Sequence, residues 1–139
     1  MATNIFDRYL ETEILSADPI KLVSLLYRGA IESVSAARRH LASGAILERS
    51  QQINRAWEIL QELAGSLDHA HGGELSRNLG ELYGYVQQRL LEANAQQSDA
   101  PLAEAEALLT TLAEAWRGIQ APAMPVPLRA GYVPVECNA

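Results

Sequence analysis

Residues 78–94, NLGELYGYVQQRLLEAN, carry the helical period that recurs through most of the chain. Leu79, Leu82, Val86 and Leu90 return every three or four residues, so they fall on one face of an α-helix. No stretch of the chain shows the sustained alternation of apolar and polar residues that a half-buried strand needs. The pattern therefore predicts an all-α protein.

The same period, with its stop signals, divides the chain into four long helices. Asp18 and Pro19 suit the N-cap and the first turn of a helix, and Gly44 suits its end. The glycine pair after His71 likewise predicts the end of the second helix. We expect helices over residues 19–43, 46–70, 74–96 and 98–119. Because the connections are short, we expect an antiparallel four-helix bundle.

Two segments fall outside this bundle, which we assign to residues 16–119. Residues 1–15 place Ile5 and Tyr9 at helical spacing, but so short a helix is not stable alone. We expect this N-terminal helical segment to cover a groove on the bundle. Residues 120–139 hold four of the six prolines, and we expect a flexible Pro-rich C-terminal tail.

Composition and charge exclude several classes of partner. The 139 residues are 48% apolar, enough for one domain with a core, and 17 acidic against 11 basic side chains give a net charge of −6. Binding to nucleic acid needs clustered Lys and Arg, so we expect no nucleic-acid partner. No apolar run is long enough to cross a bilayer, and no secretory signal is present. Cys137 is the one cysteine, so the chain can form no internal disulfide, and we expect it to be cytoplasmic. Because no apolar run is long enough, we expect no membrane insertion.

The sequence gives no support for catalysis or for a bound metal or cofactor. A di-iron bundle needs Glu-x-x-His motifs, and the chain has none. Asp68 and His71 have a related spacing but lie beside the glycine pair, so we interpret them as a polar helix end. His40 is the one candidate for an alternative class, a phosphotransfer-type helical bundle in a signalling pathway. Ser43 stands where that class would carry a lysine, which weakens this alternative.

The predicted first and third helices carry more than a core stripe. Apolar residues spread over about half the circumference of the first helix, and Leu25 lies outside even that arc. In the third helix, Asn78, Tyr85 and Arg89 fall on one flank of the leucines. The predicted core stripe consists of Leu75, Leu79, Leu82, Val86, Leu90 and Ala93, with Tyr83 on the other flank. The polar flank either seals a seam between two helices or forms the wall of a binding groove.

Four stretches, in order and with fitting spacings, resemble the FliS family of flagellar export chaperones. They are YLETEILSADPIKLVSLLYRGA, INRAWEILQEL, GGELSRNLGELYGYVQQRLLEAN and LAEAWRGI, between residues 9 and 119. The resemblance implies a cytoplasmic helical bundle, without cofactor or catalytic activity. It also implies a partner, the disordered C-terminal segment of flagellin, which the chaperone keeps from polymerising and hands to the flagellar export gate for type III secretion.

The resemblance, taken together with the apolar surplus of the first helix and the polar flank of the third, proposes residues that bind flagellin. The N-terminal tyrosine of the family corresponds to Tyr9. Gly84 and Arg28 depart from the acidic or polar residues expected at their positions, which puts the charge of the groove in doubt. The candidate flagellin-binding residues are Ile5, Tyr9, Leu25, Tyr27, Ile31, Asn78, Leu82, Tyr85 and Arg89.

Overall fold

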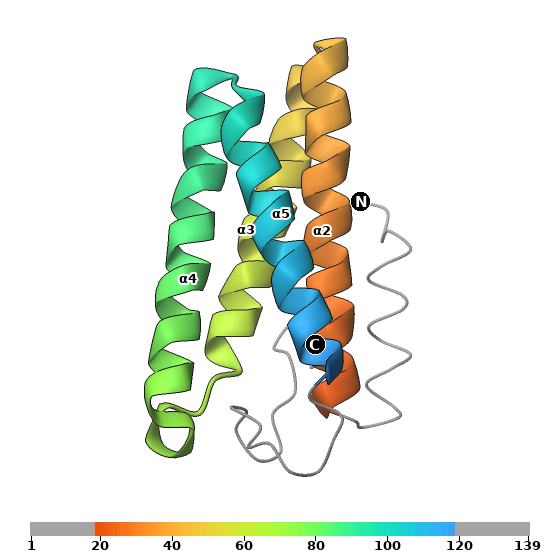
Figure 1. Cartoon of the computed structure of the whole chain (residues 1–139). Helices are drawn as coiled ribbons and strands as arrows, with labels where there is room; N and C mark the ends of the chain where they lie inside the picture. Colours follow the sequence, from red (N-terminus) through yellow and green to blue (C-terminus); the bar gives the residue numbers. More distant parts are fainter. Residues whose placement is uncertain (1–18, 119–139) are drawn as a thin grey trace, which may run out of the picture.

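The structure, a computed structural model, describes residues 19–118, and these residues form four α-helices joined by short connections (Figure 1). The helices are α2 (Pro19–Ser43), α3 (Ile46–Gly65), α4 (His69–Gln96) and α5 (Asp99–Arg117). The described residues contain no strand. The prediction of an all-α fold is therefore confirmed, whereas the expected N-terminal segment and tail lie outside the described residues.

The helices pack as an antiparallel bundle in which each helix lies against two others. α2 packs against α3 and α5, and α4 packs against the same two helices. α5 runs obliquely: its first half lies beside both α4 and the end of α2, and its last turns lie beside the start of α2, away from α4 (Figure 1). The predicted bundle is thus confirmed, and the oblique path of α5 gives it two different seams.

A single apolar core fills the space between the four helices. α2 contributes most to it, because its buried side chains cover more than half of its circumference. Leu25, which the periodicity placed outside the core arc, is 4% exposed and belongs to this core. The fully buried large side chains come from all four helices: Leu22, Val23, Leu26, Val34, Ile53, Ile59, Leu60, Leu63, Leu90, Leu102 and Leu109.

Three aromatic side chains form a layer near the start of α2. The ring of Tyr27 lies 6.4 Å from that of Tyr83 and 6.5 Å from that of Trp116, and all three residues are buried. The hydroxyl groups of Tyr27 and Tyr83 share a hydrogen bond of 2.5 Å. Trp116 donates from Nε1 to the backbone oxygen of Ile20 at 3.0 Å. The hydrogen bond from Trp116 to Ile20 joins the end of α5 to the first turn of α2.

The boundary between the second and third predicted helices is wrong. α3 ends at Gly65, and α4 begins at His69 rather than after the glycine pair. Asp68 explains the difference, because its carboxylate accepts hydrogen bonds from the backbone N–H groups of Ala70 and His71 and so caps α4. Gly73 (φ 56°) kinks the helix without ending it.

The core stripe predicted for α4 is also partly wrong. Leu75 is 43% exposed, whereas Tyr83 is 2% exposed and lies in the core. Leu75 follows the kink at Gly73, near the end of the bundle where α5 has crossed toward α2 (Figure 1). With no helix to cover it there, this leucine stays in solvent.

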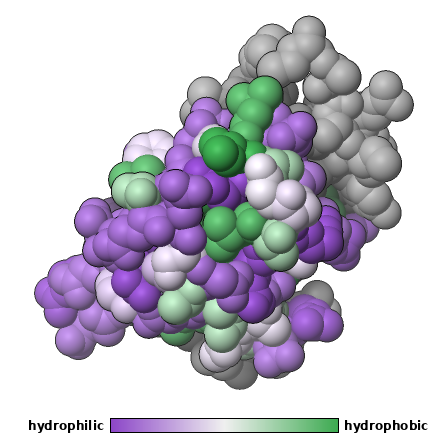
Figure 2. Space-filling model, turned by 90° about the horizontal axis from the view of Figure 1, so that it is seen from above, coloured by the Kyte–Doolittle hydropathy of each residue, from purple (hydrophilic) through white to green (hydrophobic). Residues whose placement is uncertain are grey.

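The opposite end of the bundle, where α2 ends and α3 begins, is mostly hydrophilic (Figure 2). Gly44 (φ 76°) makes the turn between the two helices, as predicted. Ile46 and Leu47 follow it as exposed apolar side chains. Among the described helices, none is both long and apolar enough to cross a bilayer.

Candidate functional site

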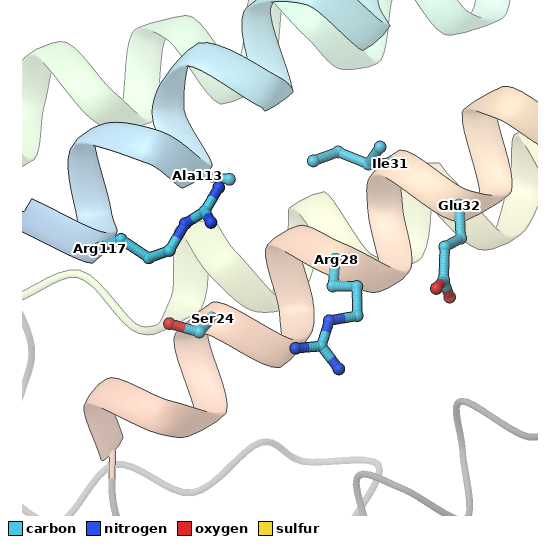
Figure 3. A pocket seen from close by; sticks show the side chains of 6 residues that line it. All are labelled: Ser24, Arg28, Ile31, Glu32, Ala113 and Arg117. Atoms are coloured by element: carbon cyan, nitrogen blue, oxygen red, sulfur yellow. The ribbon is translucent and has the colours of Figure 1, made fainter.

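A surface groove of about 250 Å³ runs between α2 and the last turns of α5 (Figure 3). Six residues line it, four from α2 and two from α5: Ser24, Arg28, Ile31, Glu32, Ala113 and Arg117. Ile31 and Ala113 are half-buried and pack against the core, so they form an apolar floor. We call this groove the open end of the α2–α5 seam.

The sequence of α2 explains why the groove forms at this place. The apolar arc of α2 is wide enough to reach past the core, and Ile31 lies at its edge. In Figure 3, Ile31 points toward the α5 side, whereas Arg28 and Glu32 point away from α5 on the same side of α2. Polar side chains therefore border an apolar strip that solvent reaches.

The other end of the same seam is closed by ion pairs. Arg38 on α2 binds Asp99 through two nitrogens, Nε at 2.8 Å and Nη2 at 2.9 Å, and binds Glu106 through Nη1 at 2.6 Å. The hydrogen bonds from Arg38 lower the pKa of Asp99, and the two carboxylates raise the pKa of Arg38. We call this cluster the closed end of the seam; it holds α2 and α5 together.

The polar flank of α4 also contacts α5. The Tyr85 hydroxyl donates to Glu104 Oε2 at 2.7 Å, and Arg89 Nε donates to Glu104 Oε1 at 2.7 Å. These hydrogen bonds lower the pKa of the Glu104 carboxylate, and the hydrogen bond to this anion raises the pKa of the Tyr85 hydroxyl. Arg89 pairs with Glu92 as well. Two of the three flank residues thus seal the α4–α5 seam.

The third flank residue, Asn78, lies apart from this network. It is exposed and forms no side-chain hydrogen bond with another described residue. Leu82 is half-buried one turn before Tyr85. Next to the same seam, Leu79, Leu108 and Leu112 are half-buried against the core. This side of α4 therefore presents a mixed apolar and polar surface beside α5.

The remaining predicted residues divide into buried, groove-lining and undescribed ones. Leu25 and Tyr27 are buried, so a partner reaches their side chains only if the bundle rearranges. Ile31 lines the open end. Ile5 and Tyr9 lie outside the described residues. The structure thus brings Tyr85 and Arg89 together on α4 and places Ile31 in a separate groove.

The sequence-based predictions missed five residues of these sites: Ser24, Glu32, Ala113 and Arg117 in the groove, and Glu104 beside the α4–α5 seam. The residues of α5 meet those of α2 and α4 only through packing between helices that lie apart in the sequence. No signal in the sequence distinguishes Glu104 from the other carboxylates of α5, Asp99, Glu106 and Glu114.

The residues considered for chemistry have structural roles. Asp68 caps α4, and its Oδ2 lies 2.8 Å from Nδ1 of His71. Over residues 19–118, no group of three or more His, Cys, Asp or Glu side chains is arranged to hold a metal ion. His40 is half-buried near the end of α2, and its carbonyl accepts hydrogen bonds from Ser43 and Ala45.

Known proteins resemble this chain over most of its length. Residues 2–123 match the family described as flagellar protein FliS. The flagellar secretion chaperone FliS of Salmonella typhimurium is 36% identical over 111 residues, 79% of this chain and 82% of that protein. The flagellar secretion chaperone FliSB of Pseudomonas aeruginosa is 36% identical over 110 residues, 79% and 87% of the two chains. FliS of Bacillus subtilis is 28% identical over 114 residues, 82% and 84%.

Proposed function

The chain belongs to the FliS family, and we propose that it is a cytoplasmic chaperone that binds the disordered C-terminal segment of flagellin. In this role it prevents premature polymerisation and delivers flagellin to the flagellar export gate for type III secretion. The family is one of chaperones and not of enzymes.

The open end of the α2–α5 seam is the observation that carries this proposal. A disordered apolar segment aggregates unless it is covered, and covering it takes a long surface rather than a deep pocket. The apolar floor formed by Ile31 and Ala113 suits one face of an amphipathic helix laid between α2 and α5. Polar residues along its border suit the backbone and the polar face of the segment.

Two other surfaces are expected to extend this contact. On α4, Asn78 and Leu82 are accessible beside the Tyr85 and Arg89 network, which would have to exchange partners on binding. At the N-terminus, Ile5 and Tyr9 are expected to contribute, as the family resemblance implies. Deleting residues 1–12 should then change the affinity for flagellin, and unchanged affinity would contradict a role for this segment.

The proposal can be tested with two neighbouring alanines on α5. Ala113 lines the open end, whereas Ala115 is exposed and does not line it. Ala113→Arg should fill the groove, and Ala115→Arg adds the same charge and volume to the same helix at almost no cost in helix propensity. The measurement is fluorescence anisotropy of a labelled C-terminal segment of flagellin from the same organism.

We expect the wild-type chain and Ala115→Arg to bind the segment equally, and Ala113→Arg to bind it much more weakly at temperatures where circular dichroism shows it folded. If the wild-type chain does not bind the segment, flagellin is not its partner. If both variants bind as tightly as the wild type, the segment occupies another surface.

A further inference from the structure

Hydrogen bonds of uncharged side chains join α3 to α4. Asn94 Oδ1 accepts from Ser50 Oγ at 3.1 Å, and Gln87 Nε2 donates to the backbone oxygen of Trp57 at 3.1 Å. Arg49 also donates to Asn94, at 3.0 Å, but this arginine is buried. The α2–α5 and α4–α5 seams are instead joined by exposed or half-exposed ion pairs.

The solvent side of the α3–α4 seam carries apolar and amide side chains and no exposed charge. Leu91 lies on α4 between Gln87 and Asn94, and it is 48% exposed. Leu47, one turn before Ser50 on α3, is 65% exposed. The exposed side chains along the seam are Leu47, Asn54 and Gln61 on α3, and Gln88, Leu91 and Ala95 on α4. We call this surface the α3–α4 face.

The absence of charge from the α3–α4 face distinguishes it on an otherwise charged chain. Charged side chains make up 20% of the sequence, and the net charge is −6. A surface that meets only water gains nothing from excluding charges, whereas the centre of a protein–protein interface is depleted of them. Two large apolar side chains exposed on the same surface also favour an interface.

We propose that a second copy of this chain covers the α3–α4 face in a two-fold symmetric dimer. In such a dimer the surface meets itself, so a charged side chain near the axis would face a like charge. An amide carries both donors and an acceptor, so it can bond its own copy across the axis. Asn54 and Gln88 are exposed and form no side-chain hydrogen bond with another described residue. The face is therefore complementary to itself.

The charge of the chain favours a second copy over an unrelated partner at this face. Two acidic chains repel one another, and a face without exposed charge lets them approach without bringing carboxylates together. A basic partner would gain from the acidic side chains that this face lacks. The inference does not rest on the proposed function, which concerns the open end of the α2–α5 seam.

The size of the face sets the expected strength of the dimer. From residue 47 to residue 61 a helix axis extends about 21 Å, and two adjacent helices are about 20 Å wide. An interface of this size lies at the low end for specific complexes, so we expect a dissociation constant on the order of tens of micromolar. Leu91 and Asn54 lie near the middle of the face, so each should lie near its own copy.

Sedimentation equilibrium of the full chain, from low micromolar to near millimolar concentration, tests the inference. The variants on the face are Leu91→Glu and Leu91→Lys. Leu75→Glu is the matched control, because Leu75 is a leucine near the other end of the same helix with a similar exposure of 43%. Glutamate and lysine are good helix formers, so all three variants should remain folded.

We expect the mean mass of the wild-type chain and of Leu75→Glu to rise with concentration from one chain toward two. Leu91→Glu and Leu91→Lys should each weaken the dimer by about tenfold or more, because like charges are brought together. An equimolar mixture of these two variants should regain part of the affinity. High salt should strengthen the wild-type dimer slightly, because it screens the repulsion between two acidic chains.

Three results would overturn the inference. The first is a wild-type chain that stays monomeric at every concentration. The second is a dimer that Leu91→Glu weakens no more than Leu75→Glu does, which would place the contact on another surface. The third is a mixture of Leu91→Glu and Leu91→Lys that associates no better than either variant alone. If the wild-type chain is monomeric and Leu91→Glu binds the flagellin segment more weakly than Leu75→Glu, flagellin covers this face instead.

Discussion

The two ends of the α2–α5 seam join the same helices but are built differently. At the closed end, Arg38 binds two carboxylates of α5 and the charges satisfy one another. At the open end, Arg117 and Glu32 have no partner among the described residues, and apolar side chains lie between the helices. The difference indicates that ion pairs between α2 and α5 hold the closed end together, whereas the open end has apolar side chains and no ion pair between these helices among the described residues.

The largest effect should come from removing a side chain of α2 from the core. Leu26 is fully buried on α2, and Leu26→Ala should lower the free energy of unfolding by about 3–5 kcal/mol through lost burial and the cavity left behind. Ile31→Ala on the groove face should cost only about 1 kcal/mol, because Ile31 is half-buried. Urea denaturation followed by circular dichroism measures both values.

Affinity for the flagellin segment should depend more on Ile31 than on Leu26, which is the reverse of their expected effects on stability. Ile31→Ala should weaken binding, since it removes part of the groove floor. Leu26→Ala should bind normally at temperatures where it remains folded. Equal losses of stability from the two substitutions would mean that Ile31 belongs to the core and that the seam has no open end.

The buried hydroxyl pair of Tyr27 and Tyr83 should give the next largest effect. Tyr83→Phe leaves the buried Tyr27 hydroxyl without its partner and should cost about 1–3 kcal/mol. The double variant with Tyr27→Phe should cost less than the sum of the two single changes, because it removes both polar groups. Additive losses measured by thermal denaturation would show that the hydroxyls do not interact.

Alkaline pH tests the same pair without a substitution. Burial raises the pKa of both Tyr27 and Tyr83 above that of an exposed tyrosine. A tyrosine with a higher pKa in the folded than in the unfolded chain makes its full contribution to stability below the unfolded-state pKa. That contribution is lost as pH rises through the folded-state pKa. The melting temperature should therefore fall above about pH 10, and less so in the double phenylalanine variant.

The closed end should show a smaller effect that the open end lacks. Arg38→Met should lower the free energy of unfolding by roughly 1 kcal/mol, because partly exposed ion pairs contribute little each. Arg117→Met should change it by roughly a few tenths of a kcal/mol. High salt should reduce the loss of stability caused by Arg38→Met. If Arg117→Met were the more destabilising change in urea denaturation, the distinction between the two ends would be wrong.

Acid should weaken the closed end specifically. The hydrogen bonds from Arg38 lower the pKa of Asp99 in the folded chain. Their contribution to the free energy of unfolding is therefore complete above the pKa that Asp99 has in the unfolded chain, and it is lost as pH falls through the pKa that Asp99 has in the folded chain. Below about pH 4 the wild-type chain should lose more stability than Arg38→Met. The two denaturation curves, measured from pH 7 to pH 2, should converge.

A small gain in stability, rather than a loss, should come from a position that touches neither end. A Cβ atom added to Gly84 on α4 would meet no other atom, so Gly84→Ala should raise the stability by about 0.5–1 kcal/mol through helix propensity. The melting temperature measures the gain. If the flagellin segment then binds less tightly, its backbone lies against α4 at Gly84.

The fold could be predicted because each helix carries its own signals. Gly44 with the apolar period of α2 defined the first helix, and the short connections implied the antiparallel order. The start of α4 was missed because a glycine pair normally ends a helix, whereas here Asp68 had already capped the next one. Leu75 and Tyr83 were interchanged because periodicity does not show that α5 leaves this part of α4 uncovered.

The groove itself could not be read from the sequence. The apolar surplus of α2 indicated a surface beyond the core, and Ile31, one of the candidate flagellin-binding residues, lines the groove there. Arg117 and Glu32 become neighbours of one groove only through the oblique crossing of α5, which depends on packing across the whole bundle. The partner of Tyr85 and Arg89, Glu104, was hidden for the same reason.

Calorimetric titration of the full chain with the C-terminal segment of flagellin, repeated at several temperatures, tests the central claim most directly. We predict a one-to-one complex of submicromolar affinity with a large negative heat-capacity change, because the disordered segment folds as it buries apolar surface. The change should be much smaller for Ala113→Arg than for Ala115→Arg. No binding, or the same heat-capacity change in both variants, would contradict a chaperone that holds flagellin at the open end of the α2–α5 seam.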